Sequence, residues 1–137
     1  MKNTFGSALC LTIFGESHGA GVGAVLDGMA AGVPVDPAAL AALMDKRRAR
    51  GDGLSTARVE ADEVRILSGV VNGRTTGTPL TLLIENHNTR SGDYAATAAL
   101  LRPGHADYTA YARYRGWQDA RGGGHFSGRI TAGLVAG

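Results

Sequence analysis

Short apolar runs near the start of the chain predict two strands. The run from Ala8 to Phe14 is apolar and bounded by glycines, which is typical of a buried strand. The segment from Gly19 to Met29 alternates larger apolar residues with small ones, the larger positions being Val22, Ala24 and Leu26. This alternation predicts a second strand, in which the glycines allow a neighbouring backbone to approach closely.

Two further strands are predicted in the middle of the chain, after a loop over residues 51–60. The runs Glu63–Val71 and Pro79–Glu85 are short, apolar and bounded by turn residues. Asn72-Gly73 follows the first run and is typical of a two-residue hairpin turn.

One helix is predicted between these two groups of strands. Asp36 is typical of a helix N-cap and Pro37 of the first helical position. Three apolar residues follow at the spacing of one helical face: Leu40, Leu43 and Met44. The cationic segment 46–48 ends the helix, where the helix dipole favours positive charge, so this cluster has a structural explanation beside any functional one.

The last third of the chain is predicted to be helical and irregular. Ala95–Leu101 and Asp107–Tyr114 are candidates for short helices, residues 116–128 for a loop, and Arg129–Ala136 for a further helix. Because strands come first and helices later, without alternation of the two, we expect a single α+β domain.

Composition favours a globular protein of a reducing compartment. The chain has 137 residues, 44% hydrophobic and 19% charged, and Cys10 is its single cysteine. No apolar run approaches the ~18 residues that a membrane-spanning helix needs. The N-terminal apolar run is followed by Glu16 and His18 and by no small-residue cleavage site, so we expect a cytoplasmic protein without a membrane partner.

The cationic residues are unusual in kind. Of 14 only Lys2 and Lys46 are lysine, which leaves 14 − 2 = 12 arginines, and the net charge is only +2. This charge is too small to indicate nucleic-acid binding. Arginine binds carboxylate and phosphate through a planar fork that lysine lacks, although a GC-rich genome would produce the same bias.

Two glycine-containing motifs resemble known functional motifs, but neither matches well enough to define a function. Gly15-Glu16-Ser17-His18-Gly19 fits the G-x-S-x-G elbow of serine hydrolases, but the elbow should enter a helix and too little chain precedes Ser17 for that fold. Residues 123–129 nearly match a phosphate-binding P-loop, with Arg129 and Ile130 in place of Lys and Ser/Thr. A triple-glycine loop before a helix could still offer backbone N–H groups to an anion, and a plain surface loop is the alternative.

The four histidines, His18, His87, His105 and His125, do not form a metal motif, since no pair has the spacing of H-E-x-x-H. We expect no metal site. His18 and His105 lie in glycine-flanked polar turns beside apolar segments, where an imidazole could donate a proton near neutral pH.

Taken in order along the chain, these motifs resemble those of the chorismate synthase family. The matching segments are FGESHG (14–19), DGMAAGVPVD (27–36), KRR (46–48), ILSGVVNGRTTGTP (66–79), NTRSGDY (88–94), RPGHADYT (102–109) and RGGGHFSGR (121–129). The resemblance spans the whole chain and implies that residues 1–137 are the N-terminal portion of a single chorismate synthase domain, the C-terminal remainder being absent from this sequence. It also implies part of a β-α-β sandwich and a homotetramer.

The resemblance implies a reaction and its cofactors. The family eliminates phosphate from 5-enolpyruvylshikimate 3-phosphate in 1,4-anti fashion to give chorismate, in the shikimate pathway of aromatic amino acid biosynthesis. This lyase reaction requires reduced FMN without net redox change, and NADPH is a possible reductant. We expect the present portion by itself to be inactive.

The resemblance also assigns residues. His18 is expected to protonate the departing phosphate, and His105 to act on the flavin side. The expected substrate-binding residues are Arg47, Arg102, Ser127 and Arg129. The FMN contacts are expected at His125, Phe126 and Ser127, and Arg47 is also linked to NADPH.

Two departures from the family pattern affect these assignments. The commoner sequence at 125–127 is Arg-Ser-Ser, whereas this chain has His-Phe-Ser, followed by Gly128. The loop at 51–54 lacks the arginine that many members have, and Arg50 is the nearest substitute. A non-catalytic anion- or nucleotide-binding module remains the alternative from another functional class.

Overall fold

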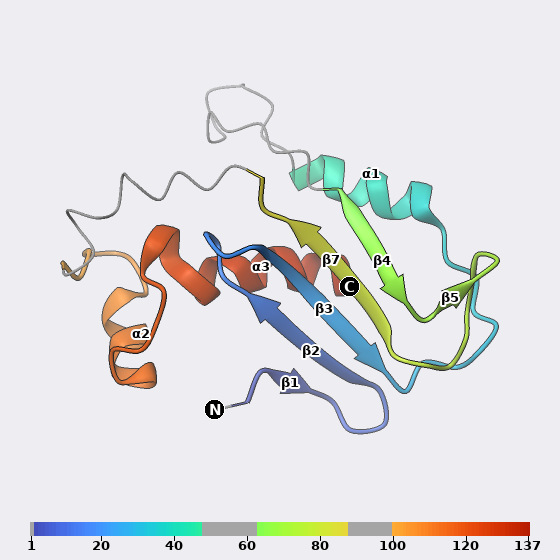
Figure 1. The fold of residues 1–137 in the computed structure, drawn as a ribbon, viewed down its shortest axis with the longest axis horizontal. Coiled ribbons are helices and arrows are strands. Elements are labelled where there is room, and N and C mark those ends of the chain that lie inside the picture. Colours follow the sequence, from blue (N-terminus) through green and yellow to red (C-terminus); the bar gives the residue numbers. More distant parts are fainter. Residues whose placement is uncertain (1, 48–62, 88–99) are drawn as a thin grey trace.

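The computed structural model of the chain describes residues 2–47, 63–87 and 100–137 and contains a five-stranded antiparallel sheet (Figure 1). In sheet order the five strands are β1 (Thr4–Phe5), β2 (Cys10–Gly15), β3 (Gly21–Asp27), β7 (Leu80–Glu85) and β4 (Val64–Ser68). A separate two-stranded ribbon consists of β5 (Val70–Val71) and β6 (Arg74–Thr75). The helices are α1 (Pro37–Arg47), α2 (Asp107–Tyr114) and α3 (Gly124–Ala136), the last preceded by a 3₁₀ turn at Arg121–Gly123.

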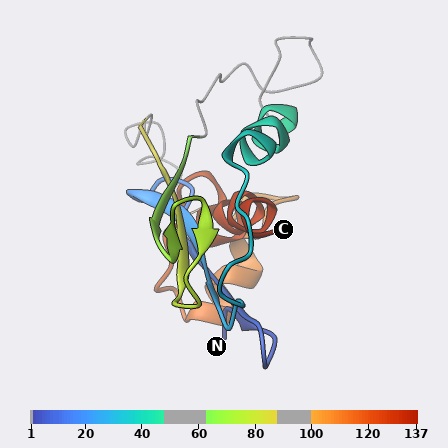
Figure 2. The same cartoon turned by 90° about the vertical axis from the view of Figure 1, so that its right-hand side faces the viewer.

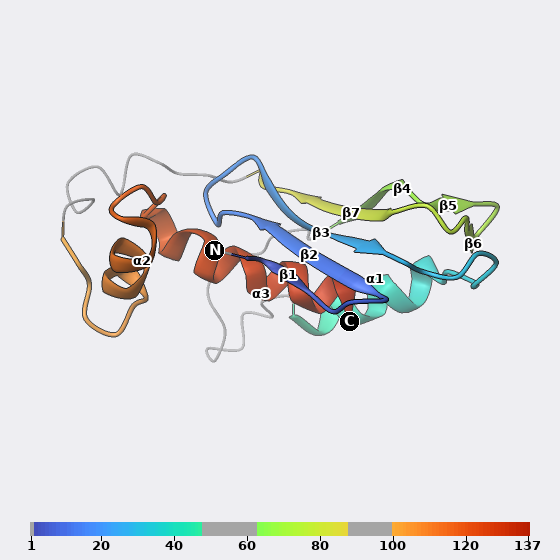
Figure 3. The ribbon, with the colours of Figure 1, turned by 90° about the horizontal axis from the view of Figure 1, so that it is seen from below.

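The helices are placed asymmetrically around this sheet. α3 packs across β2 and β3, and α1 lies beside α3 on the same face of the sheet (Figures 2 and 3). α2 lies beyond the end of the sheet, near the N-terminus of α3 (Figure 1). The predicted α+β class is therefore confirmed. Helix α3 crosses the sheet, and α2 extends the fold beyond the N-terminus of α3.

The core lies between the sheet and its two covering helices. The predicted strand at β3 is confirmed, but its burial alternates only in part: Val22 and Ala24 are buried, Gly23 between them is buried too, and Leu26 is partly buried. Val22 belongs to a cluster with Leu82 and Ile84 of β7, and α1 contributes Met44 to the same cluster. Burying side chains of this size stabilises a fold by roughly 1.5–3 kcal/mol each, so these contacts fix α1 and the sheet against each other.

The start of α1 agrees with its sequence signals. The Asp36 carboxylate accepts hydrogen bonds from the backbone N–H groups of Ala38 at 2.9 Å and Ala39 at 3.1 Å. These are two of the donors that a helix leaves without intrahelical partners at its N-terminus. The predicted N-cap at Asp36 with Pro37 in the first turn is confirmed.

The predicted hairpin is also confirmed, although its first strand is interrupted. Asn72 and Gly73 have φ values of 50° and 71°, which a tight two-residue turn of this kind requires. The expected strand at 63–71 is divided into β4 and β5 at Gly69, whose φ is 86°. A Cβ at Gly69 would lie 2.5 Å from the Leu80 Cα, so glycine allows the chain to change direction close to β7.

The expected loop over residues 116–128 is wrong in its second half. α3 begins at Gly124, five residues before the predicted start at Arg129. Glycine usually disfavours a helix, but Gly128 faces the sheet, where a Cβ would lie 2.9 Å from the Gly15 carbonyl oxygen. This residue therefore permits close packing of helix against strand, and its sequence signal is easily mistaken for that of a loop.

The remaining expectations have mixed outcomes. α2 is confirmed over the predicted residues, Asp107–Tyr114. The two-residue strand β1 is not anticipated by the sequence pattern. The expected loop at 51–60 and residues 95–99 of the expected helix 95–101 lie outside the described residues, while 100 and 101 are not helical. Among the described helices, none has the length and apolar character needed to cross a membrane.

Candidate active site

The turn between β2 and β3, residues Glu16–Ala20, carries the histidine singled out by the sequence, and we call it the histidine turn. It is closed by a hydrogen bond from the Gly19 N–H to the Glu16 carbonyl at 3.0 Å. His18 is only 7% exposed, and its Nδ1 lies 2.8 Å from the Ser17 hydroxyl oxygen. The sequence neighbours Ser17 and His18 therefore form a pair of interacting side chains.

Three consecutive glycines, Gly122–Gly124, face the histidine turn, and we call them the glycine turn. Their φ values are 58°, 96° and 56°, in the left-handed region that glycine adopts without strain. A Cβ at Gly122 would overlap the His18 ring and the Ser17 hydroxyl. The Ser17 N–H also donates to the Gly124 carbonyl at 3.0 Å, so the two turns are joined through the backbone.

Hydroxyl groups on the histidine turn and on α3 share one acceptor. The Ser17 hydroxyl donates to the Gly122 carbonyl at 3.4 Å, and the Ser127 hydroxyl donates to the same oxygen at 3.0 Å. A serine hydroxyl has one proton, so when it is directed to Gly122 the Ser17 oxygen accepts from the Nδ1–H of His18. This arrangement leaves Nε2 as the position at which the imidazole can gain or lose a proton without reorienting.

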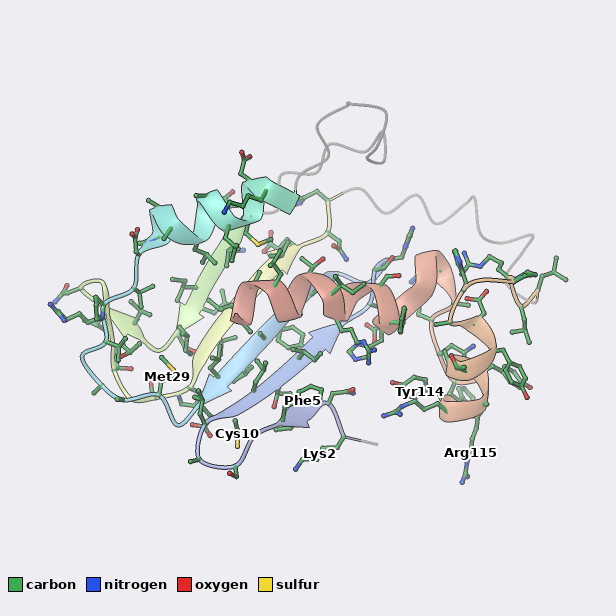
Figure 4. The ribbon with its side chains drawn as sticks, turned by 180° about the vertical axis from the view of Figure 1, so that it is seen from behind. Lys2, Phe5, Cys10, Met29, Tyr114 and Arg115 are labelled. Carbon is green, nitrogen blue, oxygen red and sulfur yellow. The ribbon has the colours of Figure 1, made fainter. Side chains whose placement is uncertain are left out.

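A pocket of about 390 Å³ opens beside the two turns, between α2 and the start of α3. Aromatic side chains in its lining are Tyr114, Trp117 and Phe126, and cationic ones are Arg113 and Arg129. Figure 4 shows Tyr114 extending from α2 toward the strands, while Arg115 points away at the end of that helix. The volume is within the ~300–1,000 Å³ typical of small-molecule sites.

The first turn of α3 supplies several groups to this pocket. His125 Nδ1 lies 2.7 Å from the Gly15 carbonyl oxygen, while its Nε2 is buried without a hydrogen-bond partner among the described residues. Arg129 lies over the Phe126 ring, 4.8 Å from its centroid. A guanidinium stacked on an aromatic face is oriented without its donors being used, so Arg129 can still bind an anion.

Asp119, which sequence motifs did not single out, contributes negative charge near His18. Its carboxylate binds Arg121 at 2.6 Å and 2.8 Å. Hydrogen bonds from the Arg121 side chain lower the pKa of Asp119, burial opposes this, and the positive charge of His18 adds a smaller lowering. The Asp119–Arg121 ion pair therefore lies close enough to His18 for the charges of Asp119 and His18 to interact.

Arg102 is held by α2. Its guanidinium donates two hydrogen bonds to the Asp107 carboxylate, at 2.8 Å and 2.9 Å, and a third to the Ala120 carbonyl at 3.0 Å. These side-chain hydrogen bonds lower the pKa of Asp107 to about 2, against the opposing effect of its burial. Arg102 thus connects the start of α2 to the segment that leads into the glycine turn.

The structure brings together some of the sequence-predicted residues and separates others. His18, His125 and Ser127 gather around the two turns, and Phe126 and Arg129 line the pocket. His105 is exposed in the loop before α2, next to Ala106, which lines the pocket. Arg47 is the last residue of α1, and its side chain lies outside the described part of the chain.

Two alternative readings of the motifs can be compared with the geometry. The G-x-S-x-G segment leads from strand β2 into strand β3, whereas the hydrolase elbow leads from a strand into a helix. Within the described residues, no three His, Cys, Asp or Glu side chains lie close enough together to hold a metal ion. The Ser17–His18 pair therefore belongs to a different kind of site from the hydrolase elbow.

The fold and site together define an α+β protein with a buried histidine beside an arginine- and aromatic-lined pocket. The family model described as chorismate synthase matches residues 9–137. The chain belongs to the chorismate synthase family.

Individual relatives agree with this membership. A chorismate synthase of Desulfovibrio desulfuricans is 51% identical over 135 residues, covering 98% of this chain and 37% of the relative. One of Campylobacter fetus subsp. fetus is 53% identical over 134 residues, with 98% and 37% coverage. A crystal structure of chorismate synthase superposes with a TM-score of 0.60 at 26% identity, covering 94% of this chain and 31% of that one. The chain thus spans somewhat more than a third of the length of these curated relatives.

Proposed function

We propose that this chain is the N-terminal part of a chorismate synthase, which forms chorismate from 5-enolpyruvylshikimate 3-phosphate by 1,4-anti elimination of phosphate. Family membership supports the reaction class. The observation that carries the assignment to this site is the buried His18, bonded to Ser17 against the glycine turn and next to a pocket with two arginines. A substrate with a phosphate and two carboxylates requires such cationic groups.

The proposed role of His18 is to protonate the departing phosphate. Because Ser17 occupies Nδ1, the transferable proton is the one on Nε2. Phosphate leaves readily only when its developing charge is neutralised, which proton transfer from an imidazolium at that atom achieves. Cleavage of the C–O bond then releases phosphate, and the ring proton that is lost in the same elimination balances the reaction.

The residues of the pocket fit reduced FMN, the cofactor that the family implies. Phe126, Tyr114 and the 91% exposed Trp117 offer aromatic surface for a flat ring system. Buried His125 Nε2 and Gln118 Oε1, both without hydrogen-bond partners among the described residues, offer polar contacts at its edge. When bound, reduced FMN would supply electron density to the substrate ring and accept the ring proton. We propose contacts to it from His125, Phe126 and Ser127, with His105 on the flavin side.

The anion site is proposed to use Arg129, Ser127, Arg102 and Arg47. Arg129 supports this role directly, since it lines the pocket with its guanidinium stacked on Phe126. Arg102 is bonded to Asp107 and Ala120, so we propose that it also positions the segment before the glycine turn.

Other parts of the proposal rest on the family resemblance alone. These are NADPH as a reductant bound near Arg47, a homotetramer of the full-length enzyme, a cytoplasmic location, and a small-molecule substrate without nucleic-acid or membrane partners. The same resemblance supports the view that residues 1–137 belong to one larger domain.

The proposal can be tested by titrating the full-length protein with FMN, with and without enolpyruvylshikimate phosphate. A lyase whose substrate and flavin share one site predicts that the substrate tightens FMN binding. A module that merely binds anions predicts competition or no effect, because phosphate and FMN would occupy the same cations. Tighter binding together with anaerobic chorismate formation supports the lyase, and competition without turnover contradicts it.

A further inference from the structure

Asn86, the residue directly after β7, contacts the histidine turn with its side chain. Its amide nitrogen lies 3.2 Å from the Glu16 carbonyl oxygen, 3.2 Å from that of Ser17 and 2.9 Å from that of Gly19. Its backbone N–H donates to the Ala20 carbonyl at 3.0 Å. One residue that is distant in sequence therefore contacts four of the five carbonyls of this turn.

The chemistry of this contact restricts which side chain can make it. Three carbonyl oxygens pointing toward one place repel each other unless a donor lies between them. A primary amide carries two N–H donors on one nitrogen, so it can donate to all three oxygens when one N–H is shared between two of them. Aspartate has the same shape but only acceptor oxygens when ionised, so it would turn three attractive contacts into repulsive ones.

The histidine turn is thus fixed from two sides. On the sheet side Asn86 holds its carbonyls. On the helix side the Ser17 N–H is bonded to the Gly124 carbonyl of α3. With the side-chain contact removed, the sheet side would keep only the backbone bond from the Asn86 N–H to the Ala20 carbonyl, and the 2.8 Å contact between Ser17 and His18 would be held less firmly relative to the sheet.

We propose that Asn86 is a positioning residue for the Ser17–His18 pair, acting through the carbonyls of the histidine turn. It does not touch the pocket and has no proposed contact with substrate or cofactor. The structural part of this proposal rests on the geometry alone, and its kinetic consequence rests on the proposed function of His18. The two parts can be tested separately.

The structural part is tested by NMR of the full-length protein with ¹⁵N-labelled histidine, comparing Asn86→Asp with a matched control. Thr75→Val is suitable, because buried Thr75 also holds a turn with its side chain, donating to Ala30 at 2.6 Å and accepting from the Val33 N–H at 3.0 Å. That turn lies away from His18. We expect Asn86→Asp to change the His18 ring nitrogen signals and their titration, and Thr75→Val to leave both unchanged.

The kinetic part uses the full-length enzyme. A displacement of about 1 Å at a reacting group can lower a rate by about 100-fold, so we expect Asn86→Asp to lower kcat about 10- to 100-fold with KM changed less than about threefold. Asn86→Gln keeps both donors on a longer side chain and should recover part of kcat. Thr75→Val should keep kcat near wild type even where it lowers stability.

Each outcome decides one of the two proposals. If Asn86→Asp fails to fold, Asn86→Ala, which also lacks the amide donors, provides the same NMR comparison, and unchanged His18 signals in the folded variant overturn the positioning role. If the His18 signals change while His18→Ala itself retains turnover, the positioning role stands and the catalytic assignment of His18 fails. Equal losses of kcat in Asn86→Asp and Thr75→Val would show a general effect of stability and overturn the inference.

Discussion

At the scale of the residue, His18 combines burial with a fixed ring orientation. Because Nδ1 is bonded to Ser17, removing the ring removes both the proposed proton donor and its hydrogen bond to Ser17. We expect His18→Ala in the full-length enzyme to lower anaerobic chorismate turnover by ~10²–10⁴, the usual contribution of a positioned acid. We expect His105→Ala to lower it by a similar factor. Near-normal turnover in either variant would exclude that histidine from the mechanism.

Gly122 offers a second test at this scale, with a control inside the same chain. Gly122→Ala would place a Cβ against the His18 ring and the Ser17 hydroxyl, at a φ of 58°. Gly73→Ala imposes a similar φ of 71° but meets nothing within 4 Å. The left-handed backbone costs ~1–2 kcal/mol in both variants, and overpacking adds ~1–3 kcal/mol in the first.

Chemical denaturation and turnover assays measure the difference between the two glycines. We expect Gly122→Ala to be the less stable variant and to lose activity, while Gly73→Ala remains active. Equal stability and equal activity of the two would mean that the close contact at the glycine turn has no functional consequence.

From sequence motifs, candidate residues of the site could be named, but the contacts between them could not be predicted. His18, His125, Ser127 and Arg129 could be named because they lie in motifs of the family. Asn86 and Asp119 could not, because their importance comes from partners 67–70 residues away in one case and from proximity to a buried histidine in the other. A polar residue after a strand gives no signal of the carbonyls that it will meet.

At the scale of the element, the Arg102–Asp107 pair holds α2 next to the rest of the site and gives it a defined pH dependence. The pKa of Asp107 is lowered from its ordinary 3.8 to about 2. A carboxyl whose pKa is lower in the folded state stabilises the fold above its unfolded pKa, and this contribution disappears as the pH falls through the folded pKa. We therefore expect about 2 kcal/mol of stability to be lost between about pH 4 and pH 2.

This loss can be measured by guanidinium unfolding at a series of pH values. Asp107→Asn keeps the shape of the side chain but removes its titration, so the difference between wild type and variant should shrink as the pH falls toward 2. Parallel curves over this range would mean that Asp107 is not bound to Arg102 in solution.

Elements were predictable where local chemistry dominates. The cap at Asp36 and the turn at Asn72-Gly73 each depend on residues that are close in sequence, and both are confirmed. The start of α3 was missed because its glycines were judged by their intrinsic preference. Gly128 is helical because of the strand it packs against, which is tertiary information.

At the scale of the whole molecule, the site is built from segments that the sequence does not pair. β3 lies between β2 and β7, so strands far apart in the chain become neighbours. This pairing carries Asn86 to the histidine turn, and α3 carries the glycine turn to its other side. The α+β class followed from the order of elements, but the strand order could not, since several antiparallel arrangements bury the same apolar faces.

The share of the family covered by this chain leads to a prediction for the isolated polypeptide. The chain corresponds to 37% of the length of the Desulfovibrio desulfuricans relative. On α3, the apolar residues Phe126 and Ile130 are 48% and 62% exposed. A partly enclosed site loses much of the electrostatic effect of its charges. We expect the 137-residue chain with reduced FMN to form no chorismate and to self-associate through α3.

An anaerobic chorismate assay combined with sedimentation tests this expectation. The variant Ile130→Glu provides the control, because a charge on the exposed face of α3 should reduce association without restoring turnover. Steady turnover by a monomer of this length would show that the residues present are sufficient for catalysis.

The histidine turn and the glycine turn are in contact in space but far apart in sequence, and this separation along the chain has a consequence for biosynthesis. Ser17 and Gly122 are 105 positions apart, and ribosomes extend a chain by about 5–20 residues per second. The histidine turn is therefore synthesised about 5–20 s before the glycines that pack against it. During that interval the Asn86 side chain is already present to bind the carbonyls of Ser17 and Gly19, whereas the Gly124 carbonyl that accepts from the Ser17 N–H has not yet been made. The contact from the residue after β7 is therefore the first of the two to become available.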